Sequence, residues 1–528
     1  YIGPLKSLVR EKLLDWKEKF ERRLHRKVIE LSGDSAPELG QVQRADIIVT
    51  TPEKWDGVSR QWQNREYVQK VGVIIIDEIH LLGADRGPII EVIVSRVRFM
   101  EERLKHHIRI VGLSTALANA KDLGDWLGIH DCGLYNFSHS VRPVQLQVHI
   151  SGYPGKHYCP RMATMNKPAY TAIRQYSPTK PVIVFVSSRR QTRLTALGLI
   201  NYAAFDNPFQ WLHMDAAEMQ ALLEMVKDAT LKETLPFGVG IHHAGMNATD
   251  RAIVERLFLQ EKIQVLCSTS TLAWGVNLPA YLVVVKGTEF HDATTCRWVD
   301  YPITDVLQMM GRAGRPQFDT SGEGCIIGLH DHIDNFARLM VMKTPIESNF
   351  MKNLCDHMNA EVIAGTVTNV REAVIWIQYT YMYIRMKKNP LVYGISNEER
   401  MRDPSLYSKC EELVEDTARK LDAAHMVRYD VETGNLFPTD LGRVASHFYI
   451  SFTTIEIVNE RLTDSSDLKA ILQIISMSSE FTSIKVRDEE IGELNDMKHN
   501  CCIVGGDLKL DDENTKTIIL LQGYIAQW

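Results

Sequence analysis

Two adjacent acids, Asp77 and Glu78, follow an apolar run at residues 71–76. Such a run predicts a strand buried on both faces, as in a parallel sheet. Ligands of open α/β sheets bind at the carboxyl ends of the strands, where these two carboxylates would lie. One acid there can hold Mg²⁺ on a nucleotide, and the second can orient and deprotonate a water molecule. The alternative is a buried strand that simply enters a solvated loop, and these residues alone do not decide.

A second group of chemically useful residues is Gln308, Arg312 and Arg315, in Gln-Met-Met-Gly-Arg-Ala-Gly-Arg-Pro. On a helix these positions share one face, because they follow i, i+4, i+7 spacing. One amide and two guanidinium groups would then point at a common site. Two convergent arginines suit a triphosphate, where they stabilise charge on the γ-phosphoryl group. The alternative is a solvated basic face, but two glycines inside a helix cost roughly 1 kcal/mol each, which disfavours a merely structural helix.

Hydroxyl-rich segments after two further apolar strands predict contacts with phosphate groups. Thr51, Pro52 and Lys54 follow the apolar run 47–49, and a proline-started helix would add free backbone N–H groups. The stretch 265–279 is a strand that continues into Ser, Thr and Gly, which let the backbone approach a phosphate or ribose. A simple helix cap explains Thr51 equally well in isolation.

The elements that must position these residues alternate between strands and amphipathic helices up to residue 345. This alternation predicts doubly wound, parallel α/β sheets. Beyond residue 345 apolar residues recur at helical spacing, and two short strands flank the turn at Thr433 and Gly434. Helices followed by a short hairpin are typical of a winged-helix module.

Composition limits the classes of protein. The 528 residues are enough for three or four domains, and the net charge of −6 argues against a wholly basic nucleic-acid coat but permits a local basic channel. Nine cysteines without a C-x-x-C pair favour reduced thiols, hence the nucleus and/or the cytoplasm. We expect no membrane segment, because no run approaches 18 apolar residues, and no signal peptide precedes the first charged helix.

The sequence contains no G-x-x-x-x-G-K-[ST] and begins at Tyr1 without Met. We therefore expect a fragment, whose phosphate-binding loop belongs to a segment before Tyr1. Its last helical pattern stops at Trp528, so we expect the final domain to be truncated as well.

Six motifs together resemble those of superfamily-two DExH-box helicases, in the large tandem-cassette (Ski/Brr-like) group. The motif that begins at Ser114 reads Ser-Thr-Ala where the family usually has Ser-Ala-Thr. In chain order the motifs lie at residues 4–10, 51–56, 77–82, 114–120, 268–279 and 308–316.

The resemblance implies ATP and Mg²⁺ as cofactors and assigns roles to residues. Asp77 and Glu78 would be metal ligands, and Glu78 would also position or deprotonate the attacking water. The γ-phosphate would meet Gln308, Arg312 and Arg315, and the nucleotide would also contact Gly275 and Asn277. The strand's phosphates would be bound by Pro4, Lys6, Thr51, Pro52, Lys54, Thr269 and Thr271, and coupling would involve His80, Ser114 and Thr115.

The expected fold class is α/β. Two RecA-like domains with parallel sheets (1–140 and 141–345) would precede a winged-helix domain (346–450) and the start of a helical ratchet domain (451–528). Segments 286–290 and 297–301 predict a β-hairpin around a polar turn. In the helicase family that the motifs resemble, a hairpin at this position separates the two nucleic-acid strands.

The function this implies is an ATP-dependent helicase or translocase that moves 3′ to 5′ on single-stranded RNA or DNA, within a multi-subunit complex. A second hypothesis is a catalytically silent, helicase-like scaffold that binds partner proteins. A DNA-repair helicase is a third. The sequence leaves RNA and DNA open as substrates.

Overall fold

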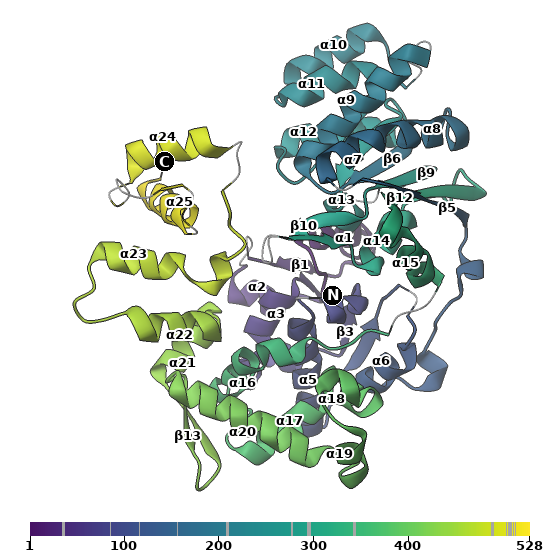
Figure 1. Cartoon of the computed structure of the whole chain (residues 1–528). Helices are drawn as coiled ribbons and strands as arrows, with labels where there is room; N and C mark the ends of the chain where they lie inside the picture. Colours follow the sequence, from purple (N-terminus) through teal and green to yellow (C-terminus); the bar gives the residue numbers. More distant parts are fainter. Residues whose placement is uncertain are drawn as a thin grey trace.

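The computed structural model describes residues 1–33, 37–84, 86–115, 117–155, 157–206, 211–275, 278–292, 297–341, 345–486, 490–502, 504, 509–510, 512 and 514–527. The chain forms two α/β lobes and a helical C-terminal part (Figure 1). We call residues 1–141 the first lobe and residues 145–341 the second lobe.

The first lobe is built on parallel strands. β1 (Val28–Leu31) pairs with β2 (Ile47–Thr50), and β3 (Val73–Ile76) pairs with β4 (Arg109–Gly112). Ile2 bridges Thr50 and Ile76, which joins the two pairs into one sheet. The remaining elements are α1 (Lys6–Trp16), the π-helix η1 (Lys17–Arg22), α2 (Leu39–Gln43), α3 (Pro52–Ser59), η2 (Trp62–Asn64), α4 (Glu66–Gln69), η3 (Ile79–Gly83), α5 (Gly87–Leu104), α6 (Ala120–Leu127), η4 (Asp131–Gly133) and η5 (His139–Val141).

Strand β3 differs from the prediction in one respect. Ile74 and Ile76 are buried, but Val73 is 53% exposed and Ile75 is half-buried. The expectation of burial on both faces was therefore wrong. Val73 lies on the wall of a large cleft instead of under a helix.

The second lobe contains a six-stranded parallel sheet in the order β5-β12-β9-β6-β8-β7. Its central strands are fully buried, as the Val- and Ile-rich sequence predicts. The strands are β5 (Gln145–Tyr153), β6 (Val182–Val186), β7 (Val239–His242), β8 (Val265–Thr269), β9 (Leu282–Lys286) and β12 (Ser321–Leu329). The helices are α7 (Tyr158–Thr164), α8 (Asn166–Tyr176), α9 (Arg189–Asp206), α10 (Ala216–Met225), α11 (Ala229–Thr234), η6 (Leu235–Phe237), α12 (Ala248–Leu259), α13 (Thr271–Gly275), α14 (Ile303–Gly311) and α15 (His330–Val341).

The predicted hairpin is present as an antiparallel pair of its own, separate from the six-stranded sheet. It consists of β10 (Glu289–Asp292) and β11 (Arg297–Asp300). Most of the predicted polar turn lies outside the described residues, at 293–296.

The C-terminal part is helical apart from the short antiparallel pair β13 (Val427–Asp430) and β14 (Asn435–Pro438), which confirms the strands predicted around Gly434. No helix in the described ranges is long and apolar enough to cross a membrane. The other elements are η7 (Phe350–Asn353), α16 (Leu354–Ile363), α17 (Val370–Gln378), α18 (Tyr381–Lys388), η8 (Pro390–Tyr393), α19 (Asn397–Arg402), α20 (Tyr407–Ala423), α21 (Asp440–Phe448), α22 (Phe452–Arg461), α23 (Leu468–Ser476), η9 (Ser479–Phe481), α24 (Ile491–Cys501) and α25 (Thr515–Ala526).

A buried ionic cluster joins the first lobe to the C-terminal part. Arg96 on α5 is 1% exposed and pairs with Asp56 on α3 at 2.7 Å and with Glu361 on α16. Its guanidinium also donates to the Ser59 hydroxyl at 2.8 Å. Because a buried charge is costly unless it is paired, these contacts hold α3, α5 and α16 in one arrangement.

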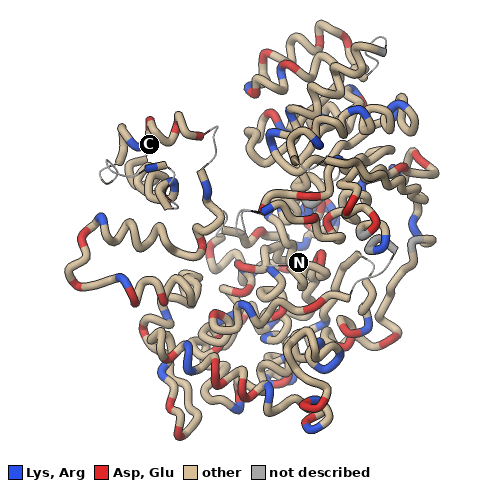
Figure 2. The backbone as a smooth tube through the Cα atoms, viewed as in Figure 1, with Lys and Arg blue, Asp and Glu red and all other residues tan. Residues whose placement is uncertain are grey.

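Charged residues of both signs occur in every part of the described backbone (Figure 2). Figure 2 shows Lys and Arg interspersed with Asp and Glu along the backbone of both lobes and the C-terminal part.

Candidate functional site

Asp77 and Glu78 lie directly after β3, at the carboxyl end of the sheet, as predicted. Asp77 accepts hydrogen bonds from the Tyr1 hydroxyl and, at 3.0 Å, from the backbone N–H of Glu78. Glu78 has a left-handed backbone, with φ of 53°. This conformation is unfavourable for a residue with a Cβ and is typical of sites where the chain must aim a side chain.

The Glu78 carboxyl group is partly withdrawn from water. Burial, and then the negative charge of Asp77, raises the pKa of Glu78 to about 7. A carboxylate with a pKa near 7 is suited to accept a proton at neutral pH.

Gln308 reaches this acid from the other lobe. Its side-chain amide, on α14, donates a hydrogen bond of 2.9 Å to Glu78 Oε2 and lies 3.4 Å from His80 Nε2. The structure therefore brings together two residues, 230 positions apart, that the sequence assigned to one site.

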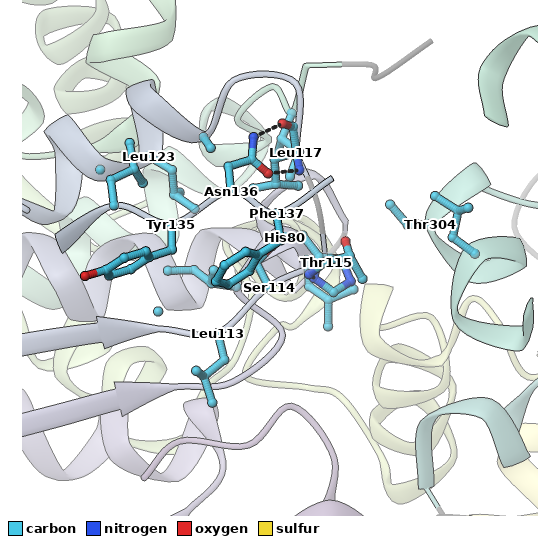
Figure 3. A pocket seen from close by; sticks show the side chains of 18 of the residues that line it. His80, Leu113, Ser114, Thr115, Leu117, Leu123, Tyr135, Asn136, Phe137 and Thr304 are labelled. Carbon is cyan, nitrogen blue, oxygen red and sulfur yellow. Dashed lines mark hydrogen bonds between the residues drawn. The ribbon is translucent and has the colours of Figure 1, made fainter. Parts of the chain in front are cut away.

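His80 connects Glu78 to the loop after β4. The ring is buried, its Nδ1 lies 3.5 Å from Glu78 Oε2, and the backbone N–H of Thr115 approaches Nδ1 at 3.5 Å. Burial lowers the pKa of His80 to about 4, so the ring is neutral at physiological pH. Figure 3 shows His80, Ser114 and Thr115 together on one side of a cleft, with Thr304 of α14 on the other.

The prediction that one helix face carries Gln308, Arg312 and Arg315 was wrong. Helix α14 ends at Gly311, with Arg312 as its C-cap, and Gly314 has φ of 84°. A Cβ at Gly314 would lie 2.5 Å from Val144 Cγ1, so this glycine is required by a turn and a close approach, not by a helix.

The two arginines consequently point to different places. Arg312 donates to the carbonyl oxygen of Ala273, and its charge acts on Glu78. Arg315 is held by Asp319, with Nε 2.8 Å from Oδ2, and by Glu261. In this structure Gln308 thus contacts Glu78 and the charge of Arg312 acts on it, whereas Arg315 is bound within its own lobe.

The residues assigned to strand phosphates occupy both sides of the boundary between the lobes. Lys6 is exposed on the first turn of α1, after the buried Pro4, and α1 packs against α13 of the second lobe. The hydroxyls of Thr269 and Thr271 lie 2.9 Å apart, at the end of β8 and the start of α13.

Thr51 is the N-cap residue of α3 and Pro52 follows at the first helical position, as predicted. Within the described part of the chain, the Thr51 side chain makes no capping hydrogen bond, so helix capping does not explain this hydroxyl. Lys54 is half-buried on the same helix.

Two motif residues, Asn277 and Ala116 of the motif at 114–120, lie outside the described residues. Gly275 is the last residue of α13.

The cleft between the lobes has a volume of about 2420 Å³ and is lined by His80, Thr115 and Thr304 among others. Sequence reasoning missed two aromatic residues on its wall, Tyr135 and Phe137. Their rings stack at 6.1 Å, and both are more than 60% exposed. The sequence pattern that could have revealed them is two aromatic residues separated by a single residue in a polar loop.

The donor set at the acid pair fits a magnesium ion. Asp77 and Glu78 supply carboxylate oxygens, the ligands that Mg²⁺ prefers, at the sheet edge where a nucleotide would lie. The Gln308 amide contacts Glu78, and the positive charge of Arg312 also acts on Glu78.

Family models match four successive parts of the chain. A DEAD/DEAH box helicase model covers residues 1–123, and a helicase conserved C-terminal domain model covers residues 168–317. A winged helix-turn-helix domain matches residues 347–430, and a Sec63 Brl domain matches residues 438–528.

Curated relatives are similar over the whole chain. Activating signal cointegrator 1 complex subunit 3 is 50% identical in Gallus gallus, over 528 residues, and 49% identical in Homo sapiens, over 529 residues. The DExH-box ATP-dependent RNA helicase DExH14 of Arabidopsis thaliana is 48% identical over 529 residues. All of this chain is covered in each case, but only 24% of each relative.

These matches confirm the resemblance seen in the motifs, including the helical domains that follow the two lobes. The chain belongs to the DEAD/DEAH box helicases, in the group that includes activating signal cointegrator 1 complex subunit 3.

Proposed function

We propose that the protein containing this chain is an ATP-driven motor that moves 3′ to 5′ along single-stranded RNA or DNA. Membership of the helicase family supports action on nucleic acid. The observation that carries the proposal is the contact between Gln308 and Glu78, since it places a residue of the second lobe on the candidate catalytic acid of the first.

Each residue of the acid pair has its own task. Asp77, with Glu78 beside it, would hold Mg²⁺, and the ion would neutralise charge on the phosphates of bound ATP. Glu78 orients the attacking water and accepts its proton, for which a raised pKa is suited. Gln308 holds the Glu78 carboxylate in place when the lobes are close.

The second lobe contributes positive charge. Arg312 already acts on Glu78, and it stabilises charge on the γ-phosphoryl group as the bond to the leaving group breaks. Arg315 reaches the same group after its contact with Glu261 opens, while Asp319 keeps its side chain oriented. Gly275 and Asn277 contribute contacts with the nucleotide.

Translocation follows from contacts with phosphates on both lobes. The groups that hold the strand are Pro4, Lys6, Thr51, Pro52, Lys54, Thr269 and Thr271. Since such contacts read no base edges, binding is independent of sequence and weakens with salt. His80, Ser114 and Thr115 couple hydrolysis to this movement, because His80 contacts both Glu78 and the loop after β4.

The proposal extends to domains and partners. The chain divides into domains at 1–140, 141–345, 346–450 and 451–528. One group of relatives is named as a complex subunit and another as an RNA helicase. We infer that the whole protein works in a multi-subunit complex in the nucleus and/or cytoplasm, with RNA as the first substrate to test.

The test is ATP hydrolysis by the full-length protein, with and without single-stranded RNA or DNA. Stimulation by a strand, lost in Glu78→Gln, is the expected result. If ATP is hydrolysed under none of these conditions, the motor hypothesis is rejected in favour of the scaffold hypothesis. If a strand does stimulate hydrolysis, a translocation assay with a label at either strand end tests the direction of movement.

A further inference from the structure

The hairpin β10–β11 needs support from outside itself. It forms a separate two-stranded sheet, and an isolated two-stranded hairpin is marginally stable in water. The chain leaves β9 through Gly287, whose N–H donates to Ile327 O at 2.8 Å, and it returns where Tyr301 N donates to Thr288 O at 2.8 Å. These bonds close only the base of the hairpin.

One face of the hairpin carries two opposed acids. Glu289 lies directly across from Asp300, and His291 directly across from Trp298, so these four side chains share a face. Like charges directly opposite in an antiparallel pair are destabilising. The face therefore requires positive or hydrogen-bonding partners from another element.

Each acid has such a partner on a different helix of the second lobe. Arg161 of α7 pairs with Glu289, and its guanidinium also donates to Gly155 O at 2.8 Å. His332 of α15 lies with Nδ1 3.0 Å from Asp300 Oδ1. Arg161 is only 6% exposed, so its pairing is less screened than a surface ion pair.

An aromatic stack adds a third attachment. The ring of Tyr158, also on α7, lies 3.6 Å from that of Trp298, at an interplanar angle of 17°. The Tyr158 hydroxyl bonds that of Ser187, at the end of β6. The hairpin is thus connected through α7 to the central strands of the second lobe.

Resting on the proposed function, and on the role in strand separation that the family resemblance implies for this hairpin, we propose that Tyr158 and Arg161 are positioning residues that hold the hairpin rigid on the second lobe. A wedge separates base pairs only if the movement of its lobe is transmitted to it. If the stack or the ion pair is removed, the duplex displaces the hairpin instead of being opened by it, while the ATP site is unchanged.

The experiment compares variants of the full-length protein in three assays: strand-stimulated ATP hydrolysis, unwinding of a duplex with a 3′ single-stranded tail, and thermal unfolding. Tyr158→Ala is expected to unwind at least tenfold more slowly, with hydrolysis within about twofold of wild type. Tyr158→Phe keeps the ring and is expected to unwind nearly normally. Tyr176→Ala is the matched control, because Tyr176 stacks on His149 at 4.2 Å in the same lobe, away from the hairpin.

A second pair of variants tests the opposed acids independently. Arg161→Met leaves Glu289 facing Asp300 without its cation, and we expect a similar loss of unwinding. Adding Glu289→Gln removes the repulsion and is expected to restore part of the unwinding rate. A general loss of folding would not be rescued by this second substitution.

The inference is overturned if Tyr158→Ala unwinds as well as Tyr176→Ala, if hydrolysis falls in parallel with unwinding, or if Glu289→Gln fails to rescue Arg161→Met. A wild-type protein that hydrolyses ATP on a strand but unwinds no duplex would instead refute the strand-separating function, and the inference with it.

Discussion

The Gln308 amide of α14 donates a hydrogen bond of 2.9 Å to Glu78 Oε2 at the end of β3. This contact crosses the boundary between the lobes and ends on the residue that we propose activates water. A hydrogen bond to a charged group contributes about 1.5–3 kcal/mol, so the approach of the lobes and the orientation of Glu78 are linked.

Replacing Glu78 by Gln should abolish strand-stimulated hydrolysis, with kcat reduced by about 10²- to 10⁴-fold, because the amide cannot accept the proton of water. Steady-state hydrolysis by the full-length protein measures this. Glu66→Gln, an exposed acid on α4, is the control and should leave the rate unchanged. Equal rates for Glu78→Gln and wild type would remove Glu78 from the mechanism.

Gln308→Ala should lower kcat/KM for ATP by about 10- to 100-fold, the loss expected for one hydrogen bond to a charged group. Gln308→Glu should be worse, since it places a second carboxylate against Glu78. The exposed Gln317→Glu, six residues past the end of α14, is the matched charge control. Activity of Gln308→Glu above that of Gln308→Ala would contradict the contact.

Arg96→Met should destabilise the protein by about 3–5 kcal/mol, because it leaves Glu361 buried without its cation and leaves Asp56 with Arg60 alone. Denaturant unfolding measures the change. Arg98→Met, two residues along the same helix, removes only a more exposed ion pair with Glu101 and should cost less than about 1 kcal/mol. Similar losses in the two variants would show that the cluster does not hold the lobe to α16.

Lys286 provides a pH test of stability. It is fully buried, its Nζ donates to Thr195 Oγ1 at 2.7 Å, and burial lowers its pKa to about 7 from 10.5. Between these values the unfolded chain binds more protons than the native protein, so wild-type stability rises with pH across this window and the penalty is complete below pH 7.

Lys286→Met should therefore be more stable than wild type by up to a few kcal/mol near pH 7, since each pKa unit corresponds to about 1.4 kcal/mol. The advantage should shrink as the pH is raised towards 10. Thermal or denaturant unfolding at several pH values measures it, and the exposed Lys167→Met serves as control. A difference that is independent of pH would mean that Lys286 is not neutralised in the native protein.

The sequence alone determined the features that depend on neighbours along the chain. The apolar run before Asp77 and Glu78 predicts a strand, and the alternation of strands and helices predicts that its end carries ligands. The hairpin around residues 289–300 and the pair around Gly434 follow from equally local patterns. Such elements form because backbone geometry and side-chain periodicity act over a few residues.

Only the tertiary structure decided which side chains meet. Arg315 turns towards Asp319 because Gly314 leaves the helical conformation against Val144, a neighbour 170 positions away. The stack of Tyr158 on Trp298 likewise joins residues that no local pattern connects. Many partners are chemically possible for each such side chain, and the choice among them rests on the summed packing of the whole fold, which no short stretch of sequence contains.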